Sequence, residues 1–399
     1  MRFPEFKGEW KYSPLNEYLT ENKERNKKGH FNKTDVLSVS GDFGIVNQIQ
    51  LLGRSFAGKS VLDYHVVRYG NIVYTKSPLK EYPYGIVKIN KGADGIVSTL
   101  YAVYNVKTNA YGKFIESYFA LPRRTNKYFK PIVRIGAKHD MKISNAEAIA
   151  NIVCFPQYAE QQKIAEFLSL LDERISTQNK IIEKLQSLIK GLVDSLLENP
   201  SWEKVYLRSF MQFYSTNSLS WEQLSYSNGN VRNLHYGLIH GFQTSMIDST
   251  LLPRILPNYL PKQYTVCQDG DVAFADASED TNEIGKAIEF SNTIDVKTVC
   301  GLHTIHGRDI KQNTILGFKG FAFNSRYFHD QVRRLAQGTK VYSITAKNLS
   351  SCYVYIPDMI KQENVVRLLN AYEENLSLNR TLLNKYEIQK QYLLQQMLI

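Results

Sequence analysis

The sequence predicts an α+β fold: two β-rich globular domains in pseudo-twofold repeat, joined by a long antiparallel two-helix coiled coil. Three observations support this prediction. The second half of the chain repeats the first, short apolar segments typical of strands fill most of each half, and each half ends in a heptad pattern. We therefore expect globular domains over residues 1–155 and 200–355, and long helices over residues 156–199 and 356–399.

The internal repeat has a period of about 200 residues, which indicates two whole domains rather than a solenoid of small units. It is clearest where 155–198 and 356–399 align without a gap. The two halves share a proline, a glutamine and a glycine-led apolar segment at equal spacing. These matches are Phe155-Pro156 with Ile356-Pro357, Gln161 with Gln362, and GNIVY (70–74) with GDVAF (270–274).

Each globular region is predicted to consist mainly of strands, with a few helices around them. Segments such as GIVSTLYAVYNV (95–106) and DVAFADAS (271–278) are rich in Val, Tyr and Phe. Glycine, asparagine and aspartate interrupt these segments, as expected for turns between strands. Pro156 and Pro357 are expected to end the last strand of each half, because proline cannot donate to a strand ladder.

Residues 164–196 and 365–397 have the spacing of a coiled coil. In the first segment, the seam positions follow each other at alternating gaps of four and three residues for about five heptads, and all but one are apolar. In the second segment, most of the same positions are apolar. The predicted seam residues are Leu168, Ile175, Gln178, Ile182, Leu185, Leu192, Leu369, Leu376, Asn379, Leu383 and Leu393. Antiparallel pairing would oppose Leu168 with Leu393, Leu185 with Leu376, and Leu192 with Leu369.

One polar residue interrupts the seam at the same place in both helices, and antiparallel pairing would set Gln178 against Leu383 and Asn379 against Ile182. A buried amide lowers stability but fixes the register of a coiled coil. The alternative is that each helix packs separately on its own domain, but the matched lengths and polar positions favour pairing. A helix of about 39 residues is roughly 58 Å long, so an antiparallel pair would hold the domains at opposite ends of a rod.

The loop pattern G-x-x-x-x-G-K-[ST] of nucleotide hydrolases occurs at residues 53–60, GRSFAGKS. Such a loop must follow a strand and begin a helix, because the helix N-terminus binds the phosphates. QIQLL (48–52) could form the strand, but VLDYHVVRYGNIVY (61–74) is typical of a turn and a strand. We therefore predict no nucleotide binding and no cofactor.

The four cysteines, Cys154, Cys267, Cys300 and Cys352, are far apart in the sequence and form no C-x-x-C pair. This spacing argues against a zinc site and against a disulfide framework, so no metal is predicted and all four are expected to be buried thiols. His303 and His306, three residues apart on a predicted strand, would point to opposite faces. Packing or base contacts are expected of them rather than metal binding.

The chain contains no apolar run of about 18 residues and no apolar segment near its N-terminus, so neither a membrane span nor a signal peptide is predicted. A cytoplasmic location follows as an expectation. The net charge is +11, and residues 1–155 carry the whole of the positive surplus. Such an uneven distribution suggests a polyanionic partner for the first globular region.

The order, spacing and duplication of these features resemble the specificity (S) subunits of type I restriction–modification systems over the full length. Each half begins with a Trp-x4-Leu start, continues with a G-D-[IV]-[VL]-[FY] segment, and closes on a proline before E-Q-x-x-I. These features are Trp10 to Leu15 and Trp202 to Leu207, GNIVY and GDVAF, and PQYAEQQKI (156–164) and PDMIKQENV (357–365). Asn71 replaces the aspartate of the pattern, and the second half lacks the E-Q pair.

The resemblance implies a subunit without catalytic activity of its own, which binds double-stranded DNA. It implies two methyltransferase (M) subunits as partners and, in the larger complex, two restriction/translocase (R) subunits. Each domain would recognise one half of a split, asymmetric site, while the helices would set the spacer and dock the M subunits. The chain lacks the N-P-P-[YF] and D-P-P-[YF] motifs of adenine methyltransferases. The alternative function is a coiled-coil adaptor that recognises a protein rather than DNA.

Two basic clusters lie at matching places in the halves, at residues 122–139 and 331–343. Arginine and lysine contact phosphates and guanine edges, so these clusters are the predicted DNA contacts. For either cluster the alternative is a solvated charged surface. The candidate residues are Arg123, Arg124, Asn126, Lys127, Arg134, Lys138, Arg333, Arg334 and Lys340.

Overall fold

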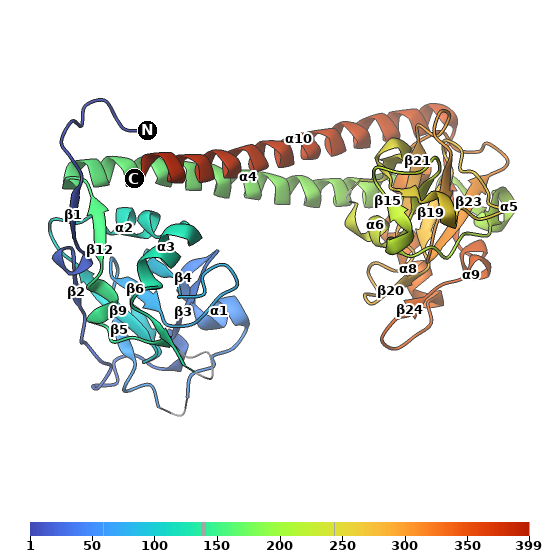
Figure 1. The fold of residues 1–399 in the computed structure, drawn as a ribbon. Helices are drawn as coiled ribbons and strands as arrows, with labels where there is room; N and C mark the ends of the chain where they lie inside the picture. The colour runs from blue at the N-terminus through green and yellow to red at the C-terminus, as the bar shows by residue number, and fades with distance from the viewer. Residues whose placement is uncertain (59, 137–140, 243, 399) are drawn as a thin grey trace. The chain divides into compact units, whose positions relative to one another are not determined.

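The computed structural model describes residues 1–58, 60–136, 141–242 and 244–398, and it confirms the predicted α+β class. The chain divides into two compact units (Figure 1). The first unit contains residues 1–179 and 382–399, and the second contains residues 180–381. Each unit therefore holds one globular domain together with part of both long helices.

The main sheet of each unit has the same strand order, so the repeat extends to topology. In the first unit the order is β2 (Leu19–Glu21), β9 (Tyr101–Val106), β6 (Ile72–Thr75) and β7 (Val87–Ile89), all antiparallel. In the second unit the corresponding order is β14 (Met211–Tyr214), β23 (Thr304–Asp309), β19 (Val272–Ala275) and β21 (Ala287–Ser291). The second sheet has one further strand, β17 (Met246–Asp248), which pairs parallel with β21.

Smaller elements surround each sheet. Those of the first unit are β3 (Leu37–Ser40), β4 (Gly44–Asn47), α1 (Gln48–Leu52), β5 (His65–Val67), β8 (Gly95–Val97), α2 (Gly112–Tyr118), α3 (Pro122–Phe129), β10 (Arg134–Ile135) and β11 (Met141–Lys142). Those of the second unit are α5 (Leu207–Phe210), β15 (Leu224–Ser225), β16 (Arg232–Leu234), α6 (Tyr236–Gly241), β18 (Arg254–Ile255), β20 (Ala277–Ser278), β22 (Thr298–Cys300), α7 (Phe318–Ala322), α8 (Arg326–Leu335), β24 (Tyr342–Ser343) and α9 (Ala346–Ser350).

An antiparallel pair of strands closes each domain where its long helix begins. β1 (Lys11–Pro14) pairs with β12 (Ile152–Phe155), and β13 (Glu203–Tyr206) pairs with β25 (Tyr353–Ile356). As predicted, Pro156 and Pro357 directly follow the last strands. The helices α4 (Tyr158–Leu197) and α10 (Met359–Met397) begin two residues later.

The two long helices run antiparallel within each unit, as predicted. In the first unit, early turns of α4 and late turns of α10 share one apolar core, which includes Leu168 and Leu393. Lys390 also forms an ion pair with Asp172 there, at 2.5 Å. In the second unit, Leu192 near the end of α4 packs against the core that contains Leu369 of α10. Among the described residues, no helix combines the length and apolarity needed to cross a membrane.

Every predicted seam residue is at least partly buried. Leu168, Gln178, Ile182, Leu369, Leu376 and Leu393 are buried, and Ile175, Leu185, Leu192, Asn379 and Leu383 are half-buried. Asn379 donates hydrogen bonds to the carbonyl oxygen and the side chain of Asn375, at 2.8 and 2.6 Å. The polar position in α10 is therefore bonded one turn back along its own helix.

The segment that resembles a phosphate loop does not have the geometry of one. QIQLL forms helix α1 rather than a strand, because Asn47 caps its first turn and Gly53 ends it with φ of 74°. The next regular element is strand β5, so no helix begins among the described residues of this loop. Lys59 lies outside the described residues.

A buried glutamine joins α4 to the first domain. Gln161 is fully buried, and its side-chain oxygen accepts a hydrogen bond from the Tyr111 backbone N–H at 2.9 Å. Its amide group donates to the carbonyl oxygens of Asn109 and Pro156, at 3.3 and 3.0 Å. One side chain thus provides hydrogen bonds to backbone groups of the loop before α2 and to a carbonyl group just before α4.

Gln362 makes the corresponding three bonds in the second unit. Its side-chain oxygen accepts from the Ile315 backbone N–H at 2.9 Å, and its amide donates to the carbonyl oxygens of Asn313 and Pro357, at 2.9 and 3.0 Å. It is 1% exposed. The glutamine at this position therefore has the same structural role in both units, which is to join the start of the long helix to its domain by three hydrogen bonds.

The neighbouring glutamate explains why the E-Q pair is incomplete in the second half. Glu160 is buried. Its carboxylate accepts hydrogen bonds from the Nε and Nη2 atoms of Arg2, each at 2.6 Å, and from the Trp10 indole at 3.3 Å. At its counterpart, Lys361 is exposed and pairs with Asp358 at 2.8 Å. The acidic side chain is needed only in the first unit, where the N-terminal segment packs on the helix.

We predict that Gln161→Met destabilises the first unit by about 2–3 kcal/mol, because it removes the hydrogen-bond partner of three backbone groups, that of Pro156 being buried and the other two partly buried. Gln362→Met should have a similar effect on the second unit. Urea unfolding followed by circular dichroism measures both. Gln162→Met is the matched control, since Gln162 makes a single surface hydrogen bond to Glu166. Equal stability of the Gln161 and Gln162 variants would contradict the anchoring role.

Candidate nucleic-acid interface

Helix α3 carries the first predicted basic cluster. Its first residue is Pro122, which suits the first position of a helix because the missing N–H would have no partner there. Tyr128 and Phe129 bury one face in the domain core. Arg123 and Lys127, one turn apart, are both exposed. The amphipathic pattern of the helix therefore presents these two cations to solvent.

Two other predicted residues of this helix make their contacts inside the protein. The Arg124 guanidinium lies over the Tyr118 ring, 4.8 Å from its centroid, and donates a hydrogen bond to the Leu398 carbonyl oxygen. Burial lowers the pKa of Arg124. Asn126 donates to the Glu81 carbonyl oxygen at 3.2 Å. Among the polar residues of α3, Arg123 and Lys127 are thus better placed to contact a ligand.

A cleft of about 920 Å³ lies beside α3 in the first unit. Strand β12, Tyr12 of β1 and late turns of α10 form its other walls. Its lining combines cations with aromatic rings, including Arg123, Arg124, Lys127, Tyr12 and Tyr118. Tyr12 is 74% exposed. The exposed cations beside this cleft can contact phosphates, so the cleft suits a nucleic acid.

The remaining candidates of the first cluster follow α3. Arg134 is exposed on the short strand β10, which pairs with β11. Lys138 lies outside the described residues.

The second cluster lies on helix α8 and the turn after it. Arg333 and Arg334 are exposed, and both contact Asp330. Arg333 pairs with its carboxylate at 3.4 Å, and Arg334 donates to its carbonyl oxygen at 2.9 Å. Lys340 is exposed in a tight turn. Gly338 has φ of 134° there, and a Cβ would lie 1.9 Å from the Val341 carbonyl oxygen, so this turn requires glycine.

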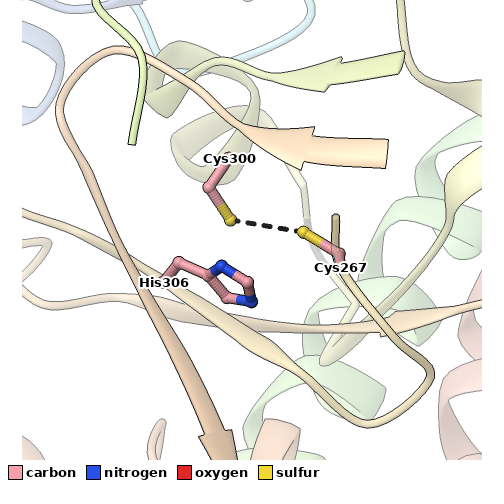
Figure 2. Close-up of side chains that lie close together, drawn as sticks. All are labelled: Cys267, Cys300 and His306. Carbon is pink, nitrogen blue, oxygen red and sulfur yellow. Dashed lines mark hydrogen bonds between the residues drawn. The ribbon is translucent and has the colours of Figure 1, made fainter. Parts of the chain in front are cut away.

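All four cysteines are buried and free, as predicted. The argument from their spacing nevertheless overlooked one group, because Cys267, Cys300 and His306 lie together in the second unit (Figure 2). Their ligand atoms lie within 4.8 Å of one another. Strand pairing brings these residues together, which linear spacing could not show. His303 precedes the strand instead and contacts the Asp276 carboxylate at 3.1 Å.

The charges around this group are unusual for a domain core. Burial would lower the pKa of His306, but Asp271 and Cys267 raise it to about 9. Burial would also raise the pKa of Cys267, but its neighbours Cys300 and His306 lower it to about 7. Cys267 is only 2% exposed, which excludes a nucleophile that must reach a substrate.

Comparison by sequence identifies no relative: no protein-family model matches the chain, and no curated protein does. The fold, rather than the sequence, indicates the class of protein. This class has two α+β domains of like topology and two long antiparallel helices.

Solved structures of this class match nearly the whole chain. A chain from a structure describing complex assembly and conformational transition of the type I R-M system matches with a TM-score of 0.59 and 14% identity, over 98% of this chain and 97% of that one. The type I restriction–modification S subunit from M. genitalium matches at 0.57 and 12%, over 96% and 95%. An HsdS subunit from Thermoanaerobacter tengcongensis scores 0.48 at 13% identity, over 100% and 98%. The chain has the fold of type I specificity subunits.

We predict that Arg123→Ala combined with Lys127→Ala weakens binding to random duplex DNA and flattens its salt dependence. Each lost phosphate contact should reduce the slope of log K against log[salt] by about one. Fluorescence anisotropy at several salt concentrations measures the slope. Lys27→Ala with Lys28→Ala removes the same charge from a solvated loop and should have little effect. Equal losses in the two double variants would contradict a specific interface.

Proposed function

We propose that this chain is the non-catalytic specificity subunit of a type I restriction–modification complex, which recognises a split, asymmetric DNA site. The repeated domain plan carries the proposal. Two domains share one strand order and one glutamine anchor, yet present different side chains. Two such domains suit two half-sites of unlike sequence. The fold shared with solved specificity subunits supports this assignment.

The basic residues on the domains supply the proposed contacts. In the first unit, Arg123 and Lys127 stand beside a cleft that also exposes the ring of Tyr12. In the second unit, Arg333 and Arg334 project from α8. Phosphate contacts orient a protein on a duplex, and contacts to base edges give specificity. Because the two sets differ in neighbours and spacing, each domain would recognise its own half-site.

The long helices would set the spacer and dock the methyltransferase subunits. Large apolar side chains remain exposed along both helices, where a partner protein would cover them. They include Leu170, Leu188, Leu378, Ile388 and Tyr392. Because the helices repeat as the domains do, two equivalent docking positions are expected, which suits two M subunits. Two R subunits would join in the full complex.

We predict that Arg333→Ala combined with Arg334→Ala abolishes discrimination at one half-site and leaves the other intact. Arg123→Ala with Lys127→Ala should affect the opposite half-site. Sequencing of methylated adenines, in cells that also express the methyltransferase subunit, identifies both halves of the recognised site. Equal loss of discrimination at both halves would contradict independent recognition domains. Salt-independent binding to a protein, without binding to DNA, would support the adaptor instead.

We also predict that adding one heptad to each long helix, at Gln178 and Asn379, lengthens the recognised spacer. Seven residues extend a helix by about 10 Å, which corresponds to roughly three base pairs. Insertion into α4 alone should shift the register of the pair and impair assembly. The same methylation map measures the spacer. An unchanged spacer in the double insertion would show that the helices do not set it.

A further inference from the structure

Three potential metal ligands converge in the core of the second unit. The sulfur atoms of Cys267 and Cys300 are 3.7 Å apart, and the His306 imidazole faces them (Figure 2). All three residues are at most 3% exposed. Two tetrahedral Zn–S bonds of about 2.3 Å separate their sulfurs by about 3.8 Å, so the observed sulfur distance suits a shared zinc ion.

His306 has one nitrogen available for a metal. Its Nε2 contacts the Asp271 carboxylate at 2.8 Å, whereas its Nδ1 is buried without a hydrogen-bond partner. A carboxylate beside Nε2 favours a proton on that nitrogen, so a metal would bind at Nδ1 and displace the proton that Nδ1 carries in the imidazolium form. Leaving a buried polar atom unpaired costs about 1–3 kcal/mol, and a metal at Nδ1 would remove this cost.

The first unit has an apolar cluster at the same place. Val103 pairs with Val73 in the first sheet as His306 pairs with Ala273 in the second. The histidine of the second unit thus stands where the first unit has a fully buried valine.

The cysteines also replace valines. Val67 pairs with Gly95, two residues before Val97. In the same way, the Cys267 N–H donates to the carbonyl oxygen of Thr298, two residues before Cys300, at 2.8 Å. Val67, Val97 and Val103 belong to one apolar cluster of the first unit. The fold therefore needs no polar groups here, and the second unit has acquired three together.

The residues around His306 differ in a correlated way. Asp271 also accepts hydrogen bonds from two Arg308 nitrogens, at 2.8 and 2.7 Å. The first unit has Asn71 and Asn105 at these positions, joined by an amide hydrogen bond of 3.0 Å. A carboxylate that holds the second nitrogen of a histidine is the usual outer partner of a metal-binding imidazole.

We propose that Cys267, Cys300 and His306 bind one zinc ion in the second unit. Two thiolates and an imidazole favour Zn²⁺ over the hard cations Mg²⁺ and Ca²⁺, which prefer oxygen ligands. A cavity of about 690 Å³ reaches Cys300 and is lined by polar side chains, including Thr216, Asn217 and Thr265. In this proposal the ion would enter from the side of Cys300, and water from the cavity would supply the fourth ligand.

The test measures metal in the full-length chain. Protein purified from zinc-supplemented medium should contain about one zinc per chain by inductively coupled plasma mass spectrometry. Metal-free protein titrated with Co²⁺ should develop thiolate-to-cobalt charge-transfer absorption. Cys267→Val, Cys300→Val and His306→Val should each lose both, and the triple valine variant, which copies the apolar cluster of the first unit, should fold without metal.

Two further variants separate a binding site from a structural role. Cys352→Val removes a buried cysteine elsewhere in the second unit and should retain the zinc. Asp271→Asn, which copies the first unit, should weaken zinc affinity about 10–100-fold without removing a ligand. Wild-type protein without zinc and without a cobalt spectrum would overturn the proposal. Unchanged zinc content in the triple variant, or a Cys267–Cys300 disulfide in protein purified from zinc-supplemented medium under reducing conditions, would overturn it equally.

Discussion

The hydrogen bonds of Gln161 and Gln362 are the constraint on which the rest of the structure depends. A proline ends the last strand of each domain, and a long helix begins two residues later. That junction buries backbone groups that no strand or helix satisfies. In both units one glutamine side chain provides three hydrogen bonds to them. Each helix is therefore attached rigidly to its own domain, as its proposed role in setting the spacing of DNA contacts requires.

Around these anchors the two domains have diverged while keeping one sheet. The four strands common to the two main sheets have the same order and register, so differences between the units lie in the added strand β17, the smaller elements, the loops and the side chains. The asparagine pair Asn71–Asn105 corresponds to the ion pair of Asp271 and Arg308. The two pairs stand at equivalent positions of the two main sheets. In either pair the polar side-chain atoms find hydrogen-bond partners in each other, so few of them remain unpaired. This tolerance allows a common framework to carry unlike surfaces.

The proposed recognition surfaces differ in their local chemistry. Arg123 and Lys127 stand beside a cleft with tyrosines, whereas Arg333 and Arg334 share Asp330 as a partner on α8. Neighbouring carboxylates weaken the attraction of an arginine for phosphate. Charge alone therefore does not define the interface. The geometry around each cation decides what it can contact.

The sequence by itself determined the repeat, the two long helices, the strand-ending prolines and the glutamine match. Heptads, prolines and a constant offset act locally or periodically, so the order of residues is sufficient to show them. Only the tertiary structure decided that Arg124 bonds Leu398, and that Cys267, Cys300 and His306 meet. Such contacts join residues far apart in the chain, and strand pairing and helix docking create them. Of the candidate site, sequence therefore located the basic clusters, and folding selected which of their side chains remain exposed.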